Sequence, residues 1–130
     1  MARILIAEDE EALRALTARG LASAGHEVLT ACDGGEALDC LVRENGRFDL
    51  LLTDIKMPVM DGIALALASA RDYPDLTILL MTGYADQRER AANLSALIHD
   101  VVTKPFSLAE IRAAVADALA AGAKAQVRSA

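Results

Sequence analysis

Short runs of apolar residues alternate with longer stretches of helical pattern along this chain, and that alternation limits the possible folds more than any other feature. Runs this short and this rich in Ile, Leu and Val are typical of strands that are covered on both faces. They occupy five segments: Arg3–Ala7, Val28–Ala31, Leu50–Thr53, Thr77–Met81 and Val101–Thr103. Strict alternation of strand and helix predicts an α/β fold with a doubly wound parallel sheet between two layers of helices.

Start and stop signals for helices lie between these runs. Three pairs fit a capping box, in which an acid or serine is followed three residues later by glutamate: Asp33 with Glu36, Asp86 with Glu89, and Ser107 with Glu110. Asp61 is expected to cap a further helix that ends before Pro74. Gly122 is expected to end the last helix, which leaves residues 122–130 as a short tail.

The core is expected to be aliphatic, because the sequence is 54% hydrophobic but only 3% aromatic. Apolar residues at three- and four-residue steps mark the inner faces of the helices. The residues expected there are Leu13, Leu16 and Gly20 in the first helix, Leu38, Leu41 and Val42 in the second, and Leu108, Ile111, Val115 and Leu119 in the last. A chain of 130 residues is long enough to form one domain around such a core.

Charge and hydropathy exclude several classes of function. The net charge of −6 opposes binding to nucleic acid and to anionic membranes. No segment is long enough to cross a bilayer, and the first apolar run is too short for a signal peptide, so a cytoplasmic location is expected. Cys32 and Cys40 match no zinc or redox spacing and are interpreted as reduced thiols, while His26 and His99 are expected to be structural or solvated.

Polar side chains gather where the expected strands end. Glu8 and Asp9 follow the first strand, Asp54 the third, Thr82 the fourth and Lys104 the fifth. Ligands of open α/β sheets bind just beyond the carboxyl ends of the strands, so these groups are expected to share one edge. An acid at this place can also be a simple helix cap, and an acidic first turn gives that reading real weight for Asp9. The helix-cap interpretation has less weight for Asp54, because no helix is expected to begin directly after it.

The chemistry of these groups indicates phosphoryl transfer assisted by Mg²⁺. Carboxylates that share a small cleft repel one another unless a cation lies between them, and hard oxygen ligands suit Mg²⁺, which also accepts phosphate oxygens. A carboxylate such as Asp54 can attack phosphorus and form an aspartyl phosphate. Lys104 and the hydroxyl of Thr82 can then contact the phosphoryl oxygens.

The motifs at these strand ends resemble the receiver domain of bacterial two-component response regulators. They are Glu8-Asp9, LLTDIKMPVMDG around Asp54, MTG ending at Gly83, and TKPF around Lys104. The resemblance covers residues 1–121 and implies a flavodoxin-like (βα)5 sandwich with strand order 2-1-3-4-5. It implies a signalling domain rather than an ordinary enzyme, phosphorylated by a histidine kinase or histidine phosphotransferase.

The same resemblance assigns roles to individual residues. It implies that Asp54 is the phosphoacceptor, that Thr82 and Lys104 contact the phosphoryl group, and that the Lys104–Pro105 peptide bond is cis. The Mg²⁺ ligands that it implies are Glu8, Asp9, Asp54 and the carbonyl of Lys56. Many receivers carry an aromatic switch residue where this chain has Val101. The switch is therefore expected to use the loop over residues 83–87, with Tyr84, and the helix after it.

The short chain is expected to be a stand-alone receiver that acts on a downstream protein target. The stretch from Leu51 to Pro105 is similar to the single-domain CpdR type, which implies an adaptor system of a AAA+ protease. Three alternatives stay open. A phosphorylation-independent pseudo-receiver would act as a binding adaptor. A haloacid-dehalogenase-like phosphatase would need an acid where Lys56 stands, and a flavin-binding flavodoxin would need a first loop free of the acids at residues 8–11.

Overall fold

The computed structural model contains one five-stranded parallel sheet in the order β2-β1-β3-β4-β5. It describes residues 2–83 and 85–129, without the side chains of residues 85–87 and 124–129. The strands are β1 (Arg3–Ala7), β2 (Glu27–Ala31), β3 (Leu50–Asp54), β4 (Thr77–Thr82) and β5 (Asp100–Thr103). Each covers or extends one of the five apolar runs. The α/β class and the predicted strand order are therefore confirmed.

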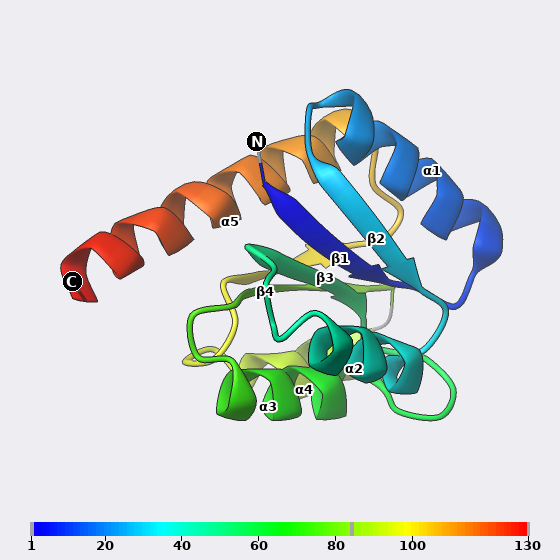
Figure 1. Ribbon diagram of the computed structural model, residues 1–130. Coiled ribbons are helices and arrows are strands. Elements are labelled where there is room, and N and C mark those ends of the chain that lie inside the picture. Colours follow the sequence, from blue (N-terminus) through cyan, green and yellow to red (C-terminus); the bar gives the residue numbers. More distant parts are fainter. Residues whose placement is uncertain (1, 84, 130) are drawn as a thin grey trace.

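A helix follows each strand, and the helices cover both faces of the sheet. They are α1 (Glu11–Ser23), α2 (Gly34–Arg43), α3 (Gly62–Asp72), α4 (Ala85–Ala92) and α5 (Leu108–Ser129). Helices α1 and α5 lie on one face, and α2, α3 and α4 lie on the other (Figure 1). This three-layer arrangement follows from right-handed crossovers that start in the middle of the sheet and wind outward in both directions.

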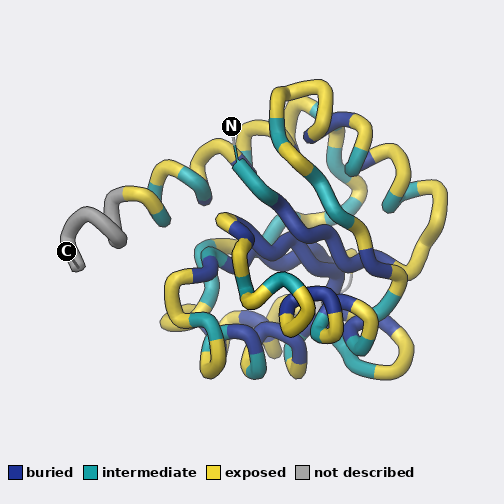
Figure 2. Tube along the Cα trace, viewed as in Figure 1, coloured by how far each residue is buried: buried dark blue, intermediate teal, exposed yellow. Residues whose placement is uncertain are grey.

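The core consists of two aliphatic layers, one on each face of the sheet. Alternate residues of a strand point to opposite faces, so Ile4 belongs to the layer under α1 and α5, whereas Leu5 belongs to the layer under α2, α3 and α4. Every residue of β3 is buried, as expected for the central strand. The inner strands β1, β3 and β4 form the buried centre in Figure 2, whereas β2 and β5 at the edges of the sheet are partly exposed, like the outer turns of the helices and the loops.

Three of the predicted helix caps are present. The Asp33 carboxylate accepts a hydrogen bond from the backbone N–H of Glu36 at 2.7 Å, and the Asp61 carboxylate accepts one from Ala64 at 2.9 Å. Ser107 and Glu110 form a reciprocal capping box, with both N···O distances at 3.0 Å. The cap predicted at Asp86 depends on a side chain that lies outside the described ones, and helix α4 is assigned from Ala85.

Two residues predicted on inner faces are exposed instead. Leu16 is 48% exposed and Val42 is 62% exposed. Helix α1 buries Gly20, as predicted, together with Thr17 and Leu21. For Leu16 the physical reason is the crossing of α5, since a Cβ atom on Gly20 would lie only 2.8 Å from a methyl carbon of Leu108. The neighbouring helix, rather than the local pattern, selects the buried face.

The end predicted for the last helix is also wrong. Helix α5 runs through Gly122 and continues to Ser129, and Figure 1 shows its last turns projecting beyond the sheet. Gly122 is required for another reason: a Cβ atom there would lie 2.3 Å from the hydroxyl oxygen of Thr77. This glycine permits close contact between α5 and β4 rather than ending the helix.

Candidate functional site

The carboxyl ends of four strands bring the predicted site residues to one edge of the sheet. In Figure 1 the arrowheads of β1 and β2 point to this edge. The registers place Ala7 opposite Thr53, and Thr82 opposite Thr103, so Glu8 and Lys104 follow strands that flank Asp54 and Thr82. A cleft of about 450 Å³ opens here. It is lined by Asp9, Glu10, Asp54, Lys56, Gly83 and Lys104.

The ammonium group of Lys104 lies between two buried carboxylates. Its Nζ is 2.5 Å from Oε1 of Glu8 and 3.1 Å from Oδ2 of Asp54. Burial raises the pKa of Glu8 to about 7, against the opposing effect of the Lys104 hydrogen bond. Burial lowers the pKa of Lys104, but its hydrogen bond to Glu8 and the charge of Asp54 outweigh that effect and raise it. Lys104 is therefore a cation at neutral pH.

The Asp54 carboxylate is held in a defined orientation at the bottom of the cleft. Its Oδ1 accepts a hydrogen bond from the backbone N–H of Ile55 at 2.9 Å, while Oδ2 faces Lys104. The turn that leads into α3 packs directly against this residue. A Cβ atom on Gly62 would lie 2.0 Å from the carbonyl oxygen of Asp54, and the Gly62 N–H donates to the Ile55 carbonyl at 2.7 Å. Only glycine allows this close approach.

Three carboxylates converge at the cleft in a way that suits a hard divalent cation. Glu8, Asp9 and Asp54 each offer an oxygen atom, and these atoms lie within 4.8 Å of one another. The second oxygen of Glu8, Oε2, is buried and has no hydrogen-bond partner within the described part of the chain. A buried carboxylate oxygen without a partner is costly, and an all-oxygen donor set matches Mg²⁺. The residues present therefore fit this ion.

A second acidic cluster within the described residues serves a structural purpose. Cys32, Asp33 and Glu36 also approach within 4.8 Å of one another. The Cys32 thiol donates to Glu36 at 2.8 Å, and this hydrogen bond raises the thiol pKa. Asp33 meanwhile caps α2. The hydrogen bonds of these groups are thus formed among themselves and with the start of α2. The prediction that Cys32 is a reduced thiol agrees with its being a free cysteine.

Glu10 and Arg14 also belong to the site, although the sequence alone does not assign them to it. Glu10 lines the cleft, although its place in an acidic stretch had suggested only a contribution to the first turn of α1. Arg14 donates to the carbonyl oxygen of Glu8 at 2.9 Å and so fixes the loop that carries the acids. The position of Arg14 one turn into the helix is the only sequence feature that could have indicated this contact.

The Lys104–Pro105 peptide bond is cis, as predicted. Tyr84 lies outside the described residues.

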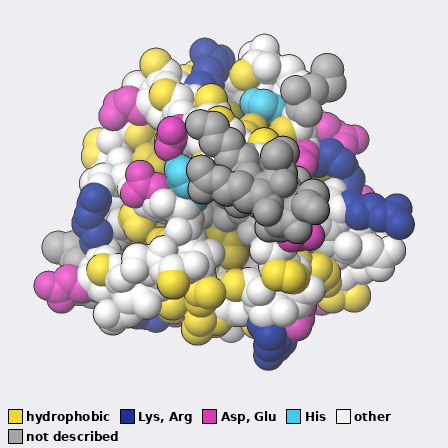
Figure 3. Space-filling model, turned by 90° about the vertical axis from the view of Figure 1, so that its left-hand side faces the viewer, with side chains coloured by type: hydrophobic (Ala, Val, Ile, Leu, Met, Phe, Trp, Pro, Cys, Tyr) yellow, Lys and Arg dark blue, Asp and Glu magenta, His cyan; other side chains and the backbone are white. Residues whose placement is uncertain are grey.

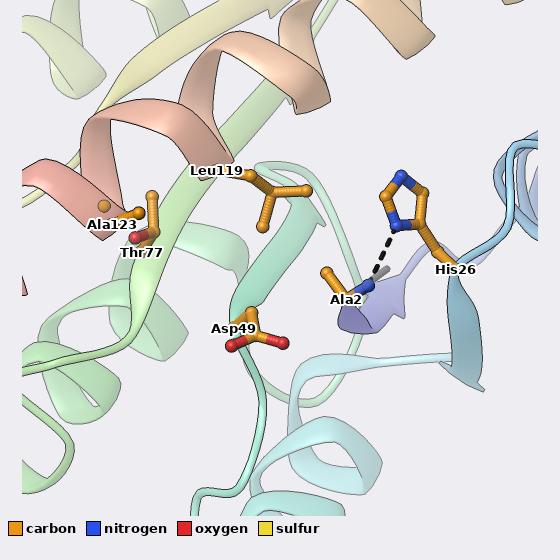
Figure 4. Close-up of a pocket in the computed structure, with 7 residues that line it drawn as sticks. Ala2, His26, Asp49, Thr77, Leu119 and Ala123 are labelled. Carbon is orange, nitrogen blue, oxygen red and sulfur yellow. Dashed lines mark hydrogen bonds between the residues drawn. The ribbon is translucent and has the colours of Figure 1, made fainter.

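The opposite edge of the sheet holds another hollow, of about 230 Å³, between α5 and the amino ends of the strands. His26, Asp49 and Thr77 are among its lining residues (Figure 4). The hydrogen bond drawn there joins the backbone N–H of Ala2 to Nδ1 of His26 at 3.2 Å, which supports the structural role predicted for this histidine. Within the described residues, neither a Lys nor an Arg side chain lines this hollow, and the groups of three potential metal ligands lie elsewhere.

The fold and the cleft together define an open α/β protein with an acidic site at the carboxyl edge of its sheet. The family model for the response regulator receiver domain matches residues 4–116, and the chain belongs to this family. Receiver domains are the phosphoacceptor signalling domains of two-component systems, and they bind Mg²⁺ at an acidic pocket. They interact with histidine kinases and with downstream effectors.

Similar proteins support this assignment. The transcriptional regulatory protein PrrA of Mycobacterium tuberculosis is 38% identical over 113 residues, which cover 87% of this chain and 48% of that protein. A receiver domain protein from Methanospirillum hungatei has a TM-score of 0.86 at 31% identity, covering 95% of this chain and 98% of that one. The response regulator TrrA of Thermotoga maritima was solved with Mg²⁺ and BeF. It has a TM-score of 0.80 at 32% identity, and the match covers 91% of this chain and 99% of that one.

The chain spans about half the length of the curated relatives that it matches first. The sensor kinase CckA of Brucella abortus is a much longer protein. It is 35% identical over 119 residues, which cover 91% of this chain but only 12% of that protein. The same unit thus occurs within different larger proteins. Within the described residues, no helix is both long and apolar enough to cross a membrane.

Proposed function

We propose that Asp54 accepts a phosphoryl group from a phosphohistidine of a histidine kinase or histidine phosphotransferase. The observation that carries this proposal is the Asp54 carboxylate itself, oriented by the Ile55 N–H and by Lys104 at the bottom of an open cleft. A carboxylate oxygen attacks phosphorus and forms an O–P bond while the N–P bond breaks. The imidazole leaves with the electron pair and takes a proton from water, and Asp54 becomes an acyl phosphate.

Charge neutralisation is the main contribution of the surrounding residues, because phosphoryl transfer depends on positioning and electrostatics. Lys104, a cation already next to Asp54, pairs with one phosphoryl oxygen. The hydroxyl of Thr82, a buried residue at the end of β4, donates to another. Glu8, Asp9, Asp54 and the carbonyl of Lys56 are proposed to hold Mg²⁺, which supplies further positive charge when bound.

A protein target is proposed for the phosphorylated form. The net charge of −6 opposes binding of this unit to nucleic acid. Figure 3 shows acidic side chains on the part of the pictured face that the described residues form. A cytoplasmic location and an adaptor system of a AAA+ protease stay predictions from the sequence, and so does the boundary at residue 121.

Intact-mass measurement after incubation with acetyl phosphate and Mg²⁺ tests the phosphoacceptor. The wild type should gain the mass of one phosphoryl group, and Asp54→Ala should gain none. Asp39→Ala is the matched control, because this exposed aspartate lies on α2 outside the cleft residues, and it should be labelled like the wild type. Equal labelling of Asp54→Ala would refute the assignment, and an unlabelled wild type would favour the pseudo-receiver alternative.

A further inference from the structure

The three carboxylates proposed to hold Mg²⁺ are not fixed in the same way. Those of Glu8 and Asp54 are buried, and both contact Nζ of Lys104. Asp9 is exposed, so packing contributes little to the position of its carboxylate. That position depends instead on the backbone of the loop between β1 and α1, which comprises residues 8–10 (Figure 1).

Two hydrogen bonds hold this loop at Glu8. The backbone N–H of Glu8 donates to the carbonyl oxygen of Ala31, at the end of β2, at 3.1 Å. The carbonyl oxygen of Glu8 accepts a hydrogen bond from Nη1 of Arg14, a half-buried residue of α1, at 2.9 Å. Because a peptide unit is planar, this carbonyl and the N–H of Asp9 move as one group. The Arg14 guanidinium therefore fixes the peptide plane that leads into Asp9.

The start of α1 differs from the starts of α2 and α3, where a side chain caps the first turn. Asp33 and Asp61 accept hydrogen bonds from the first turns of α2 and α3. The residue at the same position of α1 is Glu10, whose side chain forms no capping hydrogen bond with the described residues of the helix. A helix end without such a cap is less stable. Arg14, one turn further along, ties this uncapped end to the loop.

The charge of Arg14 makes its effect on the site distinguishable from a simple field. A guanidinium near a cation site repels the metal ion, so its field alone lowers the affinity for Mg²⁺. Its effect on geometry has the opposite sign, because a ligand held in place loses less freedom when the metal binds. Removal of the guanidinium should therefore weaken Mg²⁺ binding if geometry is the larger effect, and tighten it if the field is.

We propose that Arg14 is a positioning residue that holds Asp9 in place for Mg²⁺ and raises the affinity for the ion despite its own positive charge. The inference rests on the Mg²⁺ site proposed above. Arg14 acts through the peptide between Glu8 and Asp9 rather than by contact with the ion. Its hydrogen bond to a backbone carbonyl is suited to this role, because it fixes the backbone and leaves the neighbouring carboxylates available to the metal.

Calorimetric titration of the full chain with Mg²⁺ tests this role. In Arg14→Gln the dissociation constant should rise by about three- to fivefold, which is less than the change of about tenfold expected when the Asp9 carboxylate itself is removed. Arg19→Gln is the matched control, because Arg19 is exposed on the same helix and the substitution removes the same charge. This control should not weaken binding. Amide NMR spectra show whether each variant is folded under the conditions of the titration.

The double variant Arg14→Gln/Asp9→Ala shows whether Arg14 acts through Asp9. Once the Asp9 carboxylate is absent, loss of Arg14 should cause no further rise in the dissociation constant, so the two effects should not add. A merely structural role, in which Arg14→Gln loosens the whole site, would weaken binding by the same factor with and without the Asp9 carboxylate. That result would refute the proposal.

The outcomes also separate this role from the proposed site and function. If Asp9→Ala binds Mg²⁺ more weakly but Arg14→Gln binds it like the wild type or more tightly, the role of Arg14 is refuted while the metal site stands. If Asp9→Ala binds Mg²⁺ like the wild type, the proposed ligand set is wrong and the role of Arg14 is refuted with it. The phosphoacceptor function is tested independently, because these titrations contain no phosphodonor.

Discussion

Two clusters at opposite edges of the sheet each place one basic side chain against two carboxylates, yet their environments differ. At the amino edge Arg3 lies 2.5 Å from Glu27 and 2.7 Å from Glu44. At the carboxyl edge Lys104 lies 2.5 Å from Glu8 and 3.1 Å from Asp54. The side chain of Glu27 is 60% exposed, whereas that of Glu8 is 1% exposed. The same set of charges is solvated at one edge and buried at the other.

Because of this difference in burial, the carboxylate pKa values at the two edges shift in opposite directions. The hydrogen bond from Arg3 lowers the pKa of Glu44, whereas burial raises the pKa of Glu8 to about 7. Arg3 also donates to the carbonyl of Arg47 at 2.6 Å and lies over the Phe48 ring at 4.7 Å. The Arg3 cluster is therefore a satisfied surface network. In the Lys104 cluster, Oε2 of Glu8 is buried without a hydrogen-bond partner among the described residues, and burial disfavours the charge of Glu8; both features are typical of a ligand-binding site.

Replacing the buried cation should have the largest effect. Lys104→Met leaves Glu8 and Asp54 side by side without a counter-charge, so the free energy of unfolding should fall by about 2–4 kcal/mol at pH 8 in EDTA, measured by urea denaturation. Labelling by acetyl phosphate should be lost as well. Lys56→Met is the control, because this exposed lysine should change stability by at most about 0.5 kcal/mol. Equal denaturation midpoints for the two variants would contradict the comparison.

Metal affinity should show the next largest effect. Asp9→Ala removes one of three converging carboxylates, so the dissociation constant for Mg²⁺ should rise by about tenfold, measured by calorimetry. The metal-free variant should be at least as stable as the wild type, because the mutual repulsion is reduced. Glu10→Ala removes the same charge from the same cleft but lies outside the carboxylate group, so its effect should be smaller. Unchanged affinity in Asp9→Ala would exclude Asp9 as a ligand.

The dependence of stability on pH should differ between wild type and Glu8→Gln. The pKa of Glu8 rises from its ordinary value of 4.5 to about 7 in the folded protein. Between these values the folded state binds more protons than the unfolded state, so stability decreases as pH increases through this range. Glu8→Gln removes that dependence and should gain about 1–2 kcal/mol relative to wild type from pH 4.5 to 7.5. Parallel stability curves in EDTA would show that Glu8 titrates normally.

The amino-edge cluster should show the smallest effect. Glu27→Gln removes one exposed partner of Arg3, and the remaining contacts with Glu44 and the Arg47 carbonyl persist. The melting temperature should fall slightly at low ionic strength and match the wild type in concentrated salt, where exposed ion pairs are screened. A loss as large as that of Lys104→Met would remove the distinction between the two clusters.

The sequence by itself determined the strands and the edge at which the chemistry lies. Apolar runs identify buried strands, and parallel strands all end at the same edge, so Glu8, Asp54 and Lys104 could be placed near one another without coordinates. The caps at Asp33, Asp61 and Ser107 were also predictable, because they depend on contacts three residues apart. The strand order, in contrast, came from the resemblance to the receiver family.

Only the tertiary structure decided which groups form pairs and which helix faces are buried. Lys104 and Glu8 are 96 positions apart, and no local pattern reveals that their side chains meet. Leu16 and Val42 fit a helical period but are exposed, because the neighbouring elements select the buried face. Gly122 had suggested a helix end, yet it allows α5 to pack closely against Thr77 of β4. Local signals depend on contacts a few residues apart, whereas packing and long-range pairing depend on where distant elements meet.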